Sequence, residues 1–460
     1  MRGLIVLVLL ASAGCVAPAA VSPVSLEAPP VLSAVFDIDH DHEDPALHAM
    51  TWNATLLAHA HPELDGLGWL EMNELDLMGD LLLVGVNAGK PGEEASEGGF
   101  LVFDVSDPTA PALLHYERSP DAASCIGDVK AGPGEAQVTL ATQCARDASR
   151  GHGFVVYDLA DPAAPRVLAL APEGTSCHMV DTSVVGGVSY VYCASAVGAA
   201  VFRLTETPLG LQAVLVNPNL PLEPTSARHL PLAMSEFGTA GPLFMVFPHD
   251  MTTQPDPLTG EPIVVVSHSY SGIRILDGRD PALGRVLGTW SGEGASSYSW
   301  IHTAHAVVMD GRRIVVGITE NVVNTPPRFW VVDFTDYANP VLLAEHDLAA
   351  QADSHDLVYS LHNFQVVGTR MYVAAYHGGV WALDLADPTA PREVGFALSG
   401  QPVYVKPEGT FWGIGNNWAE QVWDVVVKDG YVFASDMASG LHVYAFEGAA
   451  LGDASQRSFG

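Results

Sequence analysis

One repeated phrase limits the fold of this chain more than any other feature. An apolar run, an Asp and a turn that contains Pro recur in FLVFDVSDPTAPALL (100–114), FVVYDLADPAAPRVL (154–168), FWVVDFTDYANPVLL (329–343) and VWALDLADPTAPREV (380–394). Looser copies are VFRLTETPLGLQAVL (201–215), IRILDGRDPALGRVL (273–287) and LHVYAF (441–446). The seven units recur roughly every 50 residues, a period typical of propeller blades.

Each unit predicts four antiparallel strands. A β-branched strand runs into a Gly- and Asp-rich turn, a second strand follows, the third carries the repeated phrase, and the fourth begins at its Pro. Asp before Pro favours a turn because the carboxylate accepts a bond from the backbone ahead and Pro fixes φ. We therefore expect an all-β fold, a seven-bladed β-propeller of four-stranded antiparallel blades.

The two ends of the chain are expected to close this ring. The last unit supplies only three strands, and its fourth is missing at the C-terminus. The segment NATLLAHA (53–60), just before the first unit, matches PVLLAEHD (340–347), a fourth strand. An N-terminal strand that completed blade seven would remove an exposed sheet edge. The predicted propeller then spans residues 53–448, with a C-terminal tail at 449–460.

The repeated phrase resembles the LVIVD repeat of bacterial and archaeal surface proteins. The resemblance extends over most of the chain and implies a propeller at the cell surface. It says little about activity, because one fold carries many functions.

The N-terminus predicts export. Arg2 precedes the short apolar run Leu4–Leu10, which is too short to span a bilayer and is typical of a signal peptide, here residues 1–15. Small residues before Cys15 resemble a lipobox, so Cys15 is the predicted lipidation site. Ser12 stands where Leu is commoner, and an ordinary secretory signal remains the alternative. The protein is thus expected outside the cytoplasm, held to the membrane by its N-terminal lipid or secreted.

Residues 16–52 are predicted to be a tether and an acidic, His-rich linker. The stretch VAPAAVSPVSLEAPPVLS (16–33) is rich in Ala, Pro and Ser, as tethers are. The segment DIDHDHEDPALH (37–48) could bind metal, but its low apolar content favours a solvated linker.

The charge balance restricts the partners. Lys and Arg number 20 against 53 Asp and Glu, a formal charge of −33. Such a surface repels nucleic acid and excludes a cationic helix lying on anionic lipid. It suits metal cations or basic partners.

Titratable side chains gather where the inner strands are expected to start, at one mouth of the central channel. When the blades are aligned on the first-turn Gly, His305, His362 and Asp424 share one position, and His178 and His249 take it in blades with longer turns. The second strands return to the same mouth and end at His268, Glu320 and His377. His302 and His355 lie near this ring but out of register, and they rank lower.

These residues support two interpretations. Neutral imidazoles and a carboxylate can bind Zn, Cu or Fe, so one hypothesis is a divalent transition metal bound by at least three of His249, His268, His305, Glu320, His362 and His377. The alternative is that each His bonds a backbone carbonyl and locks blade to blade, and recurrence in a repeat favours that alternative.

The long loops of this face carry exposed aromatic residues. Phe411, Trp412 and Trp418 lie in the loop 399–421. They suggest contact with a protein or a small molecule, or packing over the channel. An unknown protein or small-molecule ligand at this looped face, and a monomeric chain, are the partner predictions.

Four cysteines flank predicted hairpin turns. Cys125 and Cys144 flank one turn, and Cys177 and Cys193 flank another. Each pair joins the start of a first strand to the end of a second, so the two are cross-strand neighbours within disulfide reach. Since exported proteins meet an oxidising compartment, we predict both disulfides. A Cys-rich metal site is the alternative.

Two classes of function remain. The sequence has no GxSxG elbow, P-loop, HExxH, CxxC, or GxGxxG after a strand, so local catalytic motifs are absent. The favoured class is a cell-surface binding or interaction platform with a metal site at the channel mouth. The other is a metal-dependent enzyme, a His-ligated oxidoreductase working at the same mouth.

Overall fold

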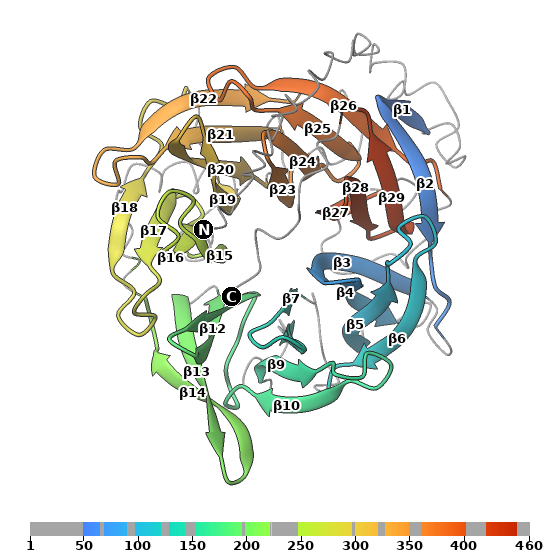
Figure 1. Cartoon of the computed structure of the whole chain (residues 1–460), viewed down its shortest axis with the longest axis vertical. Helices are drawn as coiled ribbons and strands as arrows, with labels where there is room; N and C mark the ends of the chain where they lie inside the picture. The colour runs from blue at the N-terminus through green and yellow to red at the C-terminus, as the bar shows by residue number, and fades with distance from the viewer. Residues whose placement is uncertain are drawn as a thin grey trace, which may run out of the picture.

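The fold was analysed in a computed structural model. It describes residues 49–64, 69–89, 97–120, 128–142, 152–195, 198–220, 222, 247–296, 300–320, 327–348, 360–401 and 420–448. Seven antiparallel sheets are arranged in a ring (Figure 1), and inner strands of several of them line a central cavity. The predicted all-β, seven-bladed propeller is confirmed.

The first four blades follow the repeat along the chain. Blade one contains β3 (Trp69–Met78), β4 (Leu81–Gly89), β5 (Glu97–Asp104) and β6 (Ala112–Arg118). Blade two contains β7 (Val129–Ala131), β8 (Gln137–Thr142), β9 (Gly153–Asp158) and β10 (Arg166–Leu170). Blade three contains β11 (Met179–Val185), β12 (Val188–Ser195), β13 (Gly198–Thr207) and β14 (Gly210–Asn217). Blade four contains β15 (Asp250–Pro255), β16 (Pro262–Ser267), β17 (Ile273–Asp277) and β18 (Val286–Trp290). In each, the first strand is innermost.

The last three blades complete the ring. Blade five contains β19 (Ile301–Met309), β20 (Arg312–Thr319), β21 (Arg328–Asp333) and β22 (Val341–Asp347). Blade six contains β23 (Phe364–Val367), β24 (Arg370–Ala374), β25 (Val380–Asp384) and β26 (Arg392–Leu398), with β1 (Met50–Trp52) added outside. Blade seven contains β27 (Val422–Lys428), β28 (Tyr431–Asp436), β29 (Gly440–Phe446) and β2 (Ala54–Ala60).

Closure by an N-terminal strand is confirmed. Strand β2 pairs antiparallel with β29, with Ala54 opposite Phe446 and Ala60 opposite Leu441. One correction concerns the predicted linker 16–52, because its last residues form β1 on the edge of blade six. Trp52 is buried there and its ring lies 6.5 Å from that of Phe396. Burial of this indole therefore extends the propeller N-terminally beyond residue 53.

The repeated phrase forms the turn that its residues predict. The carboxylate of Asp104 accepts a bond from Ser106 N at 2.9 Å, and that of Asp158 accepts one from Ala160 N at 2.9 Å. Both bonds satisfy backbone groups at the surface end of a third strand, where the chain must reverse. The recurrence of the phrase thus has a local structural cause.

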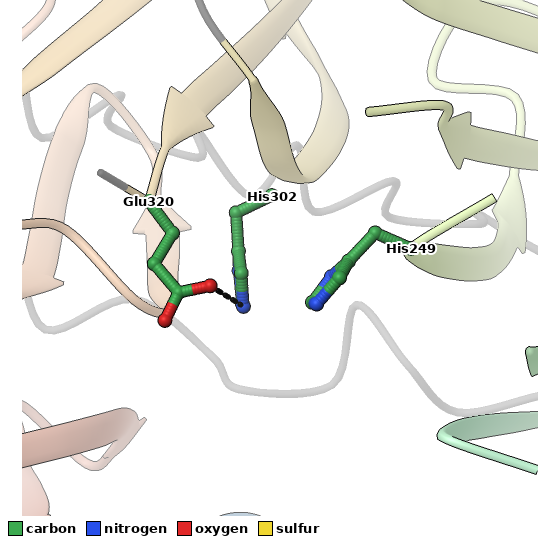
Figure 2. A group of neighbouring side chains, drawn as sticks. All are labelled: His249, His302 and Glu320. Carbon is green, nitrogen blue, oxygen red and sulfur yellow. Dashed lines mark ion pairs between the residues drawn. The ribbon is translucent and has the colours of Figure 1, made fainter. Parts of the chain in front are cut away.

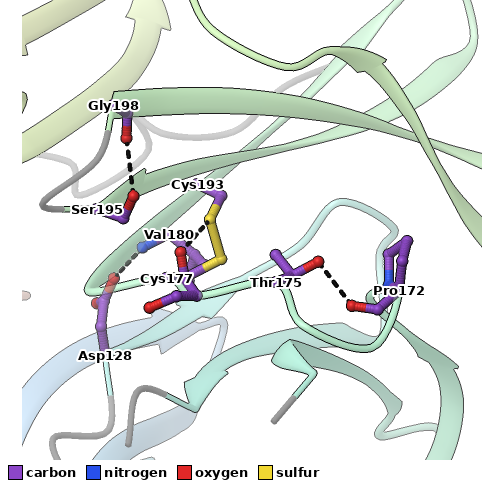
Figure 3. The surroundings of a disulfide bond; sticks show 9 residues. Asp128, Pro172, Thr175, Cys177, Val180, Cys193, Ser195 and Gly198 are labelled. Carbon is purple, nitrogen blue, oxygen red and sulfur yellow. Dashed lines mark hydrogen bonds between the residues drawn. A yellow bond between two sulfur atoms is a disulfide. The ribbon is translucent and has the colours of Figure 1, made fainter. Parts of the chain in front are cut away.

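One of the two predicted disulfides lies within the described residues. Cys177 and Cys193 are bonded, with their Cα atoms 5.2 Å apart (Figure 3). The bond ties the segment before β11 to the end of β12. The Cys125–Cys144 pair, Cys15, the segment 37–48 and the tail 449–460 lie outside the described residues. Within the described ranges, no helix is long and apolar enough to span a membrane.

Candidate metal centre

Four imidazoles form an arc at one mouth of the channel, one from each of blades three to six. We call His178, His249, His302 and His362 the imidazole arc. The Nε2 atoms of His178 and His249 are 3.0 Å apart. The ring centroid of His302 lies 4.2 Å from that of His249 and 4.2 Å from that of His362. His178 and His249 immediately precede β11 and β15, so the start of each inner strand delivers its ring to the mouth.

A carboxylate completes the centre of this arc. Glu320, directly after β20, lies beside His302, and the ring of His249 faces them from the next blade (Figure 2). The three side chains each offer a ligand atom within 4.8 Å of the others. His302 Nε2 and Glu320 Oε2 are 3.6 Å apart. Two donors about 2.1 Å from one tetrahedral ion would be ~3.4 Å apart, so this spacing suits a shared ion.

Burial keeps the arc uncharged. It lowers the pKa of His178 to about 4 and holds the pKa values of His249, His302 and His362 well below 6.5. Repulsion from other rings of the arc, His178 among them in each case, lowers the pKa values of His249, His302 and His362 further, while a backbone group of the next blade opposes this lowering. The imidazoles are therefore neutral at pH 7, the form that binds metal.

Glu320 titrates close to neutrality. Burial raises the pKa of its carboxyl to about 7, although a hydrogen bond from Tyr376 acts in the opposite direction. A cation bound beside it would favour the ionised form.

A hydrogen-bond chain fixes the tautomer of His302. Thr303 Oγ1 donates to Asn363 Oδ1 at 3.0 Å, so it can only accept from His302 Nδ1, 2.7 Å away. Asn363 Nδ2 in turn donates to Glu74. His302 Nε2 is thereby left as a lone pair, buried and without a hydrogen bond to any described residue. Such outer contacts orient metal-binding histidines in general.

The opposite side of the mouth, on blades seven, one and two, is acidic. Asp424, Glu74 and Asp128, which we call the acidic half, are all buried. Asp424 Oδ2 accepts from Leu75 N at 2.8 Å, a bond from one blade to the next. Desolvation raises the pKa of Asp424, and it raises that of Glu74 well above 4.5. The predicted ligand Asp424 thus acts as a blade-to-blade latch, and it lies outside the group of convergent donors.

Asp128 makes the corresponding link between blades two and three. Its Oδ2 accepts from Val180 N at 2.6 Å (Figure 3). Its Oδ1 pairs with Lys130 Nζ at 3.0 Å. Desolvation raises the pKa of Asp128 to about 6, and Lys130 limits the rise. The carboxylate is therefore mostly ionised at pH 7.

His305 does not join the arc, and His302 takes its place. His305 pairs with Val316 across the hairpin, and its ring lies 4.7 Å from that of Phe364, beside the channel. The register between β19 and β20 shifts between Ile301 and Thr303, so a bulge at His302 presents that ring to the mouth. No local sequence signal marks the bulge, since the two histidines differ only in this pairing.

The other predicted ligands are distributed around the arc. His178 and His362 belong to it, while His268 and His377 are buried outside the convergent group. Desolvation, then Arg274, lowers the pKa of His268 to about 3. Phe411, Trp412, Trp418 and His355 lie outside the described residues.

Comparison with known proteins agrees with this architecture. Residues 95–116 match the family model described as LVIVD repeat. The protein is a seven-bladed β-propeller that carries an LVIVD repeat at residues 95–116. No curated protein matches it.

One solved structure supports the fold of this propeller. The chain is similar to the crystal structure of the β-propeller domain of Cps50 (Swd1) from Myceliophteria thermophila, with 10% identity and a TM-score of 0.51 over 85% of this chain and 99% of that one. A second match is the WD40 β-propeller domain of Doa1, with 10% identity and a TM-score of 0.47 over 86% of this chain and 97% of that one. At such identities, the first match shows only a shared fold.

Proposed function

We propose that the channel mouth is a divalent transition-metal centre in which His249, His302 and Glu320 are the protein ligands. The convergence of their donor atoms within 4.8 Å carries the proposal. The neutral, tautomer-fixed His302 supports it, because a metal ligand must present a lone pair. His178 and His362, next in the arc, are the candidates for a further nitrogen ligand.

This set of donor atoms narrows the choice of metal ion. Two imidazoles and one carboxylate recur in zinc sites and in non-haem iron sites, and imidazole also suits copper. Three protein ligands leave a coordination position for water or a ligand. The formal charge of −33 attracts cations to the surface and raises their local concentration.

The LVIVD-repeat propeller serves in this proposal as an exported interaction platform. The N-terminal sequence supports anchoring to the cell membrane through Cys15, and the Cys177–Cys193 bond is consistent with an oxidising compartment. A partner would approach the mouth and complete the coordination of the ion with its own donor.

A metal-dependent enzyme, an oxidoreductase, is the second candidate. The observation that favours it is the three-ligand set, because an open coordination position is what catalytic sites retain and structural sites lack. A redox-active ion in the purified protein would favour this candidate, and a redox-inert one the platform.

Metal content of three proteins tests the proposal. Apo wild type, His302→Ala and His305→Ala are incubated with Zn²⁺, Cu²⁺ or Fe²⁺, freed of unbound ion and analysed for metal. Wild type and His305→Ala should retain about one equivalent and His302→Ala little, because only His302 lies in the donor group. Less than about 0.1 equivalent of every metal in wild type would make the arc structural.

A further inference from the structure

We infer that Tyr376 is the positioning residue of this centre, because its phenol holds one oxygen of Glu320 and thereby turns the other toward His302. The inference rests on the proposed metal centre and identifies what sets the geometry of its carboxylate ligand.

The two carboxylate oxygens of Glu320 have separate neighbours. Tyr376 Oη donates to Oε1 at 2.5 Å, while Oε2 lies 3.6 Å from His302 Nε2. A glutamate carboxylate otherwise rotates with little preference about its last bond. The phenol removes that freedom, so Oε2 is presented to the space between the imidazoles before an ion arrives.

The phenol is itself held in place by its ring. Tyr376 is fully buried, and its ring meets that of His362 edge-on at 5.5 Å and that of Trp423 at 5.8 Å. The ring of His362 in turn lies 3.7 Å from that of Trp423. These contacts involve carbon atoms, so replacement by Phe would remove the hydroxyl and keep the packing.

The backbone of Tyr376 is left-handed, and this conformation recurs in the repeat. Its φ of 47° lies in the left-handed region, which non-Gly residues seldom adopt. Two hydrogen bonds of 3.1 Å with Val422 N and O hold it against blade seven. Ser269 in blade four has a φ of 42° and a similar bridge to Ile301, but its hydroxyl donates to Phe247 O. The left-handed residue and its bridge to the next blade are thus a structural feature of both blades. Blade six differs in placing a phenol at this position.

Hydrogen bonds to metal-binding side chains have a measurable effect. Loss of such an outer contact typically weakens metal affinity 10- to 100-fold, because the ligand must then be ordered when the ion binds. Tyr376 approaches Glu320 from blade six, while Glu320 follows the β20 strand of blade five. The positioning residue and its ligand therefore belong to neighbouring sheets, and their contact crosses the blade boundary.

Cobalt titration tests the role of the hydroxyl. Apo wild type, Tyr376→Phe and Tyr372→Phe are titrated with Co²⁺ and followed by visible absorption. Tyr376→Phe should bind 10- to 100-fold more weakly with an altered spectrum and a similar melting temperature. Tyr372→Phe, whose ring packs on Phe446 in the same region of blades six and seven, should match wild type.

A double-variant cycle tests whether Tyr376 acts through Glu320. Tyr376→Phe should weaken binding in the wild-type background and have no further effect when combined with Glu320→Gln. If Tyr376→Phe folds poorly, Glu320→Asp is the second variant. Its shorter side chain moves the carboxylate away from the Tyr376 hydroxyl, so it should weaken metal binding similarly. Unchanged affinity in Tyr376→Phe, or an equal loss with and without Glu320→Gln, would overturn the inference. If wild type binds no Co²⁺, that result would instead contradict the proposed metal centre itself.

Discussion

The acidic half and the imidazole arc occupy equivalent ends of the inner strands, yet their buried polar groups are satisfied differently. Asp424 and Asp128 accept backbone N–H bonds from the next blade, at 2.8 and 2.6 Å. In the arc, rings face rings. Among described residues, His249 Nδ1, His302 Nε2 and His362 Nδ1 make no hydrogen bond of ordinary geometry, although a backbone group of the next blade lies near each ring.

This difference indicates which buried polar groups serve the fold. A buried donor or acceptor without a partner costs about 1–3 kcal/mol, so folding alone favours the arrangement of the acidic half. The arc bears that cost at several nitrogen atoms, and bound metal would offset it. Recurrence in a repeat therefore explains the latches, and the proposed metal centre would account for the arc.

Removal of strand β2 should have the largest effect on stability, and it acts on the side of the ring that carries the acidic half. Blade seven, which carries Asp424, needs an N-terminal strand as its fourth strand, whereas the four strands of each of blades three to six follow one another along the chain, and β1 only extends the outer edge of blade six. A chain lacking residues 16–62 should lose cooperative melting or aggregate, because the edge of β29 loses its partner. A chain lacking only 16–33 should melt like wild type, and equal melting of both truncations would contradict the closure.

Breaking a latch should reduce stability and spare the metal. Asp128→Ala leaves Lys130 without this buried carboxylate and removes the bond to Val180 N. The free energy of unfolding should fall by about 3–5 kcal/mol in urea titrations at pH 7. Zinc content should stay at the wild-type value, and its loss would show that the two halves are not separate.

The two halves should also respond to pH with opposite sign. His178 has a pKa of about 4 in the folded protein and about 6.5 unfolded, so its contribution to stability is complete above pH 6.5 and is lost as pH falls toward 4. Asp128, with a pKa of about 6 folded, contributes stability that is present below pH 4 and lost as pH rises toward 6.

Urea titrations of apo protein at pH 7.5 and 5 measure this difference. Relative to His178→Gln, wild type should lose about 2 kcal/mol of unfolding free energy over that range. Relative to Asp128→Asn, it should gain stability as the pH falls. Parallel pH profiles of wild type and His178→Gln would show that the fold does not hold this imidazole neutral.

The sequence was sufficient for features that depend on local pattern. The repeat period and the turn chemistry of Asp104 and Asp158 predict the blades because each turn is stabilised by its own residues. The match between 53–60 and 340–347 predicts closure, since a fourth strand needs only the right edge. The Cys177–Cys193 bond follows from cross-strand spacing.

Features that depend on packing across the ring were missed. His302 takes the place in the arc that was predicted for His305, because the β19–β20 pairing has a bulge at His302. No residue of β19 predicts this bulge. Asp424 is a latch because Leu75 of the first blade lies beside it. Tyr376 reaches Glu320 only through the meeting of blades five and six. Each depends on contacts between segments distant in sequence, and the linear pattern does not encode them.

Anomalous diffraction from crystals of the full chain grown with Co²⁺ tests the central claim most directly. The account predicts one strong peak at the channel mouth, about 2.0–2.2 Å from a nitrogen of His249, a nitrogen of His302 and an oxygen of Glu320. A map with no peak between these side chains, or with a peak only elsewhere in the chain, would contradict it.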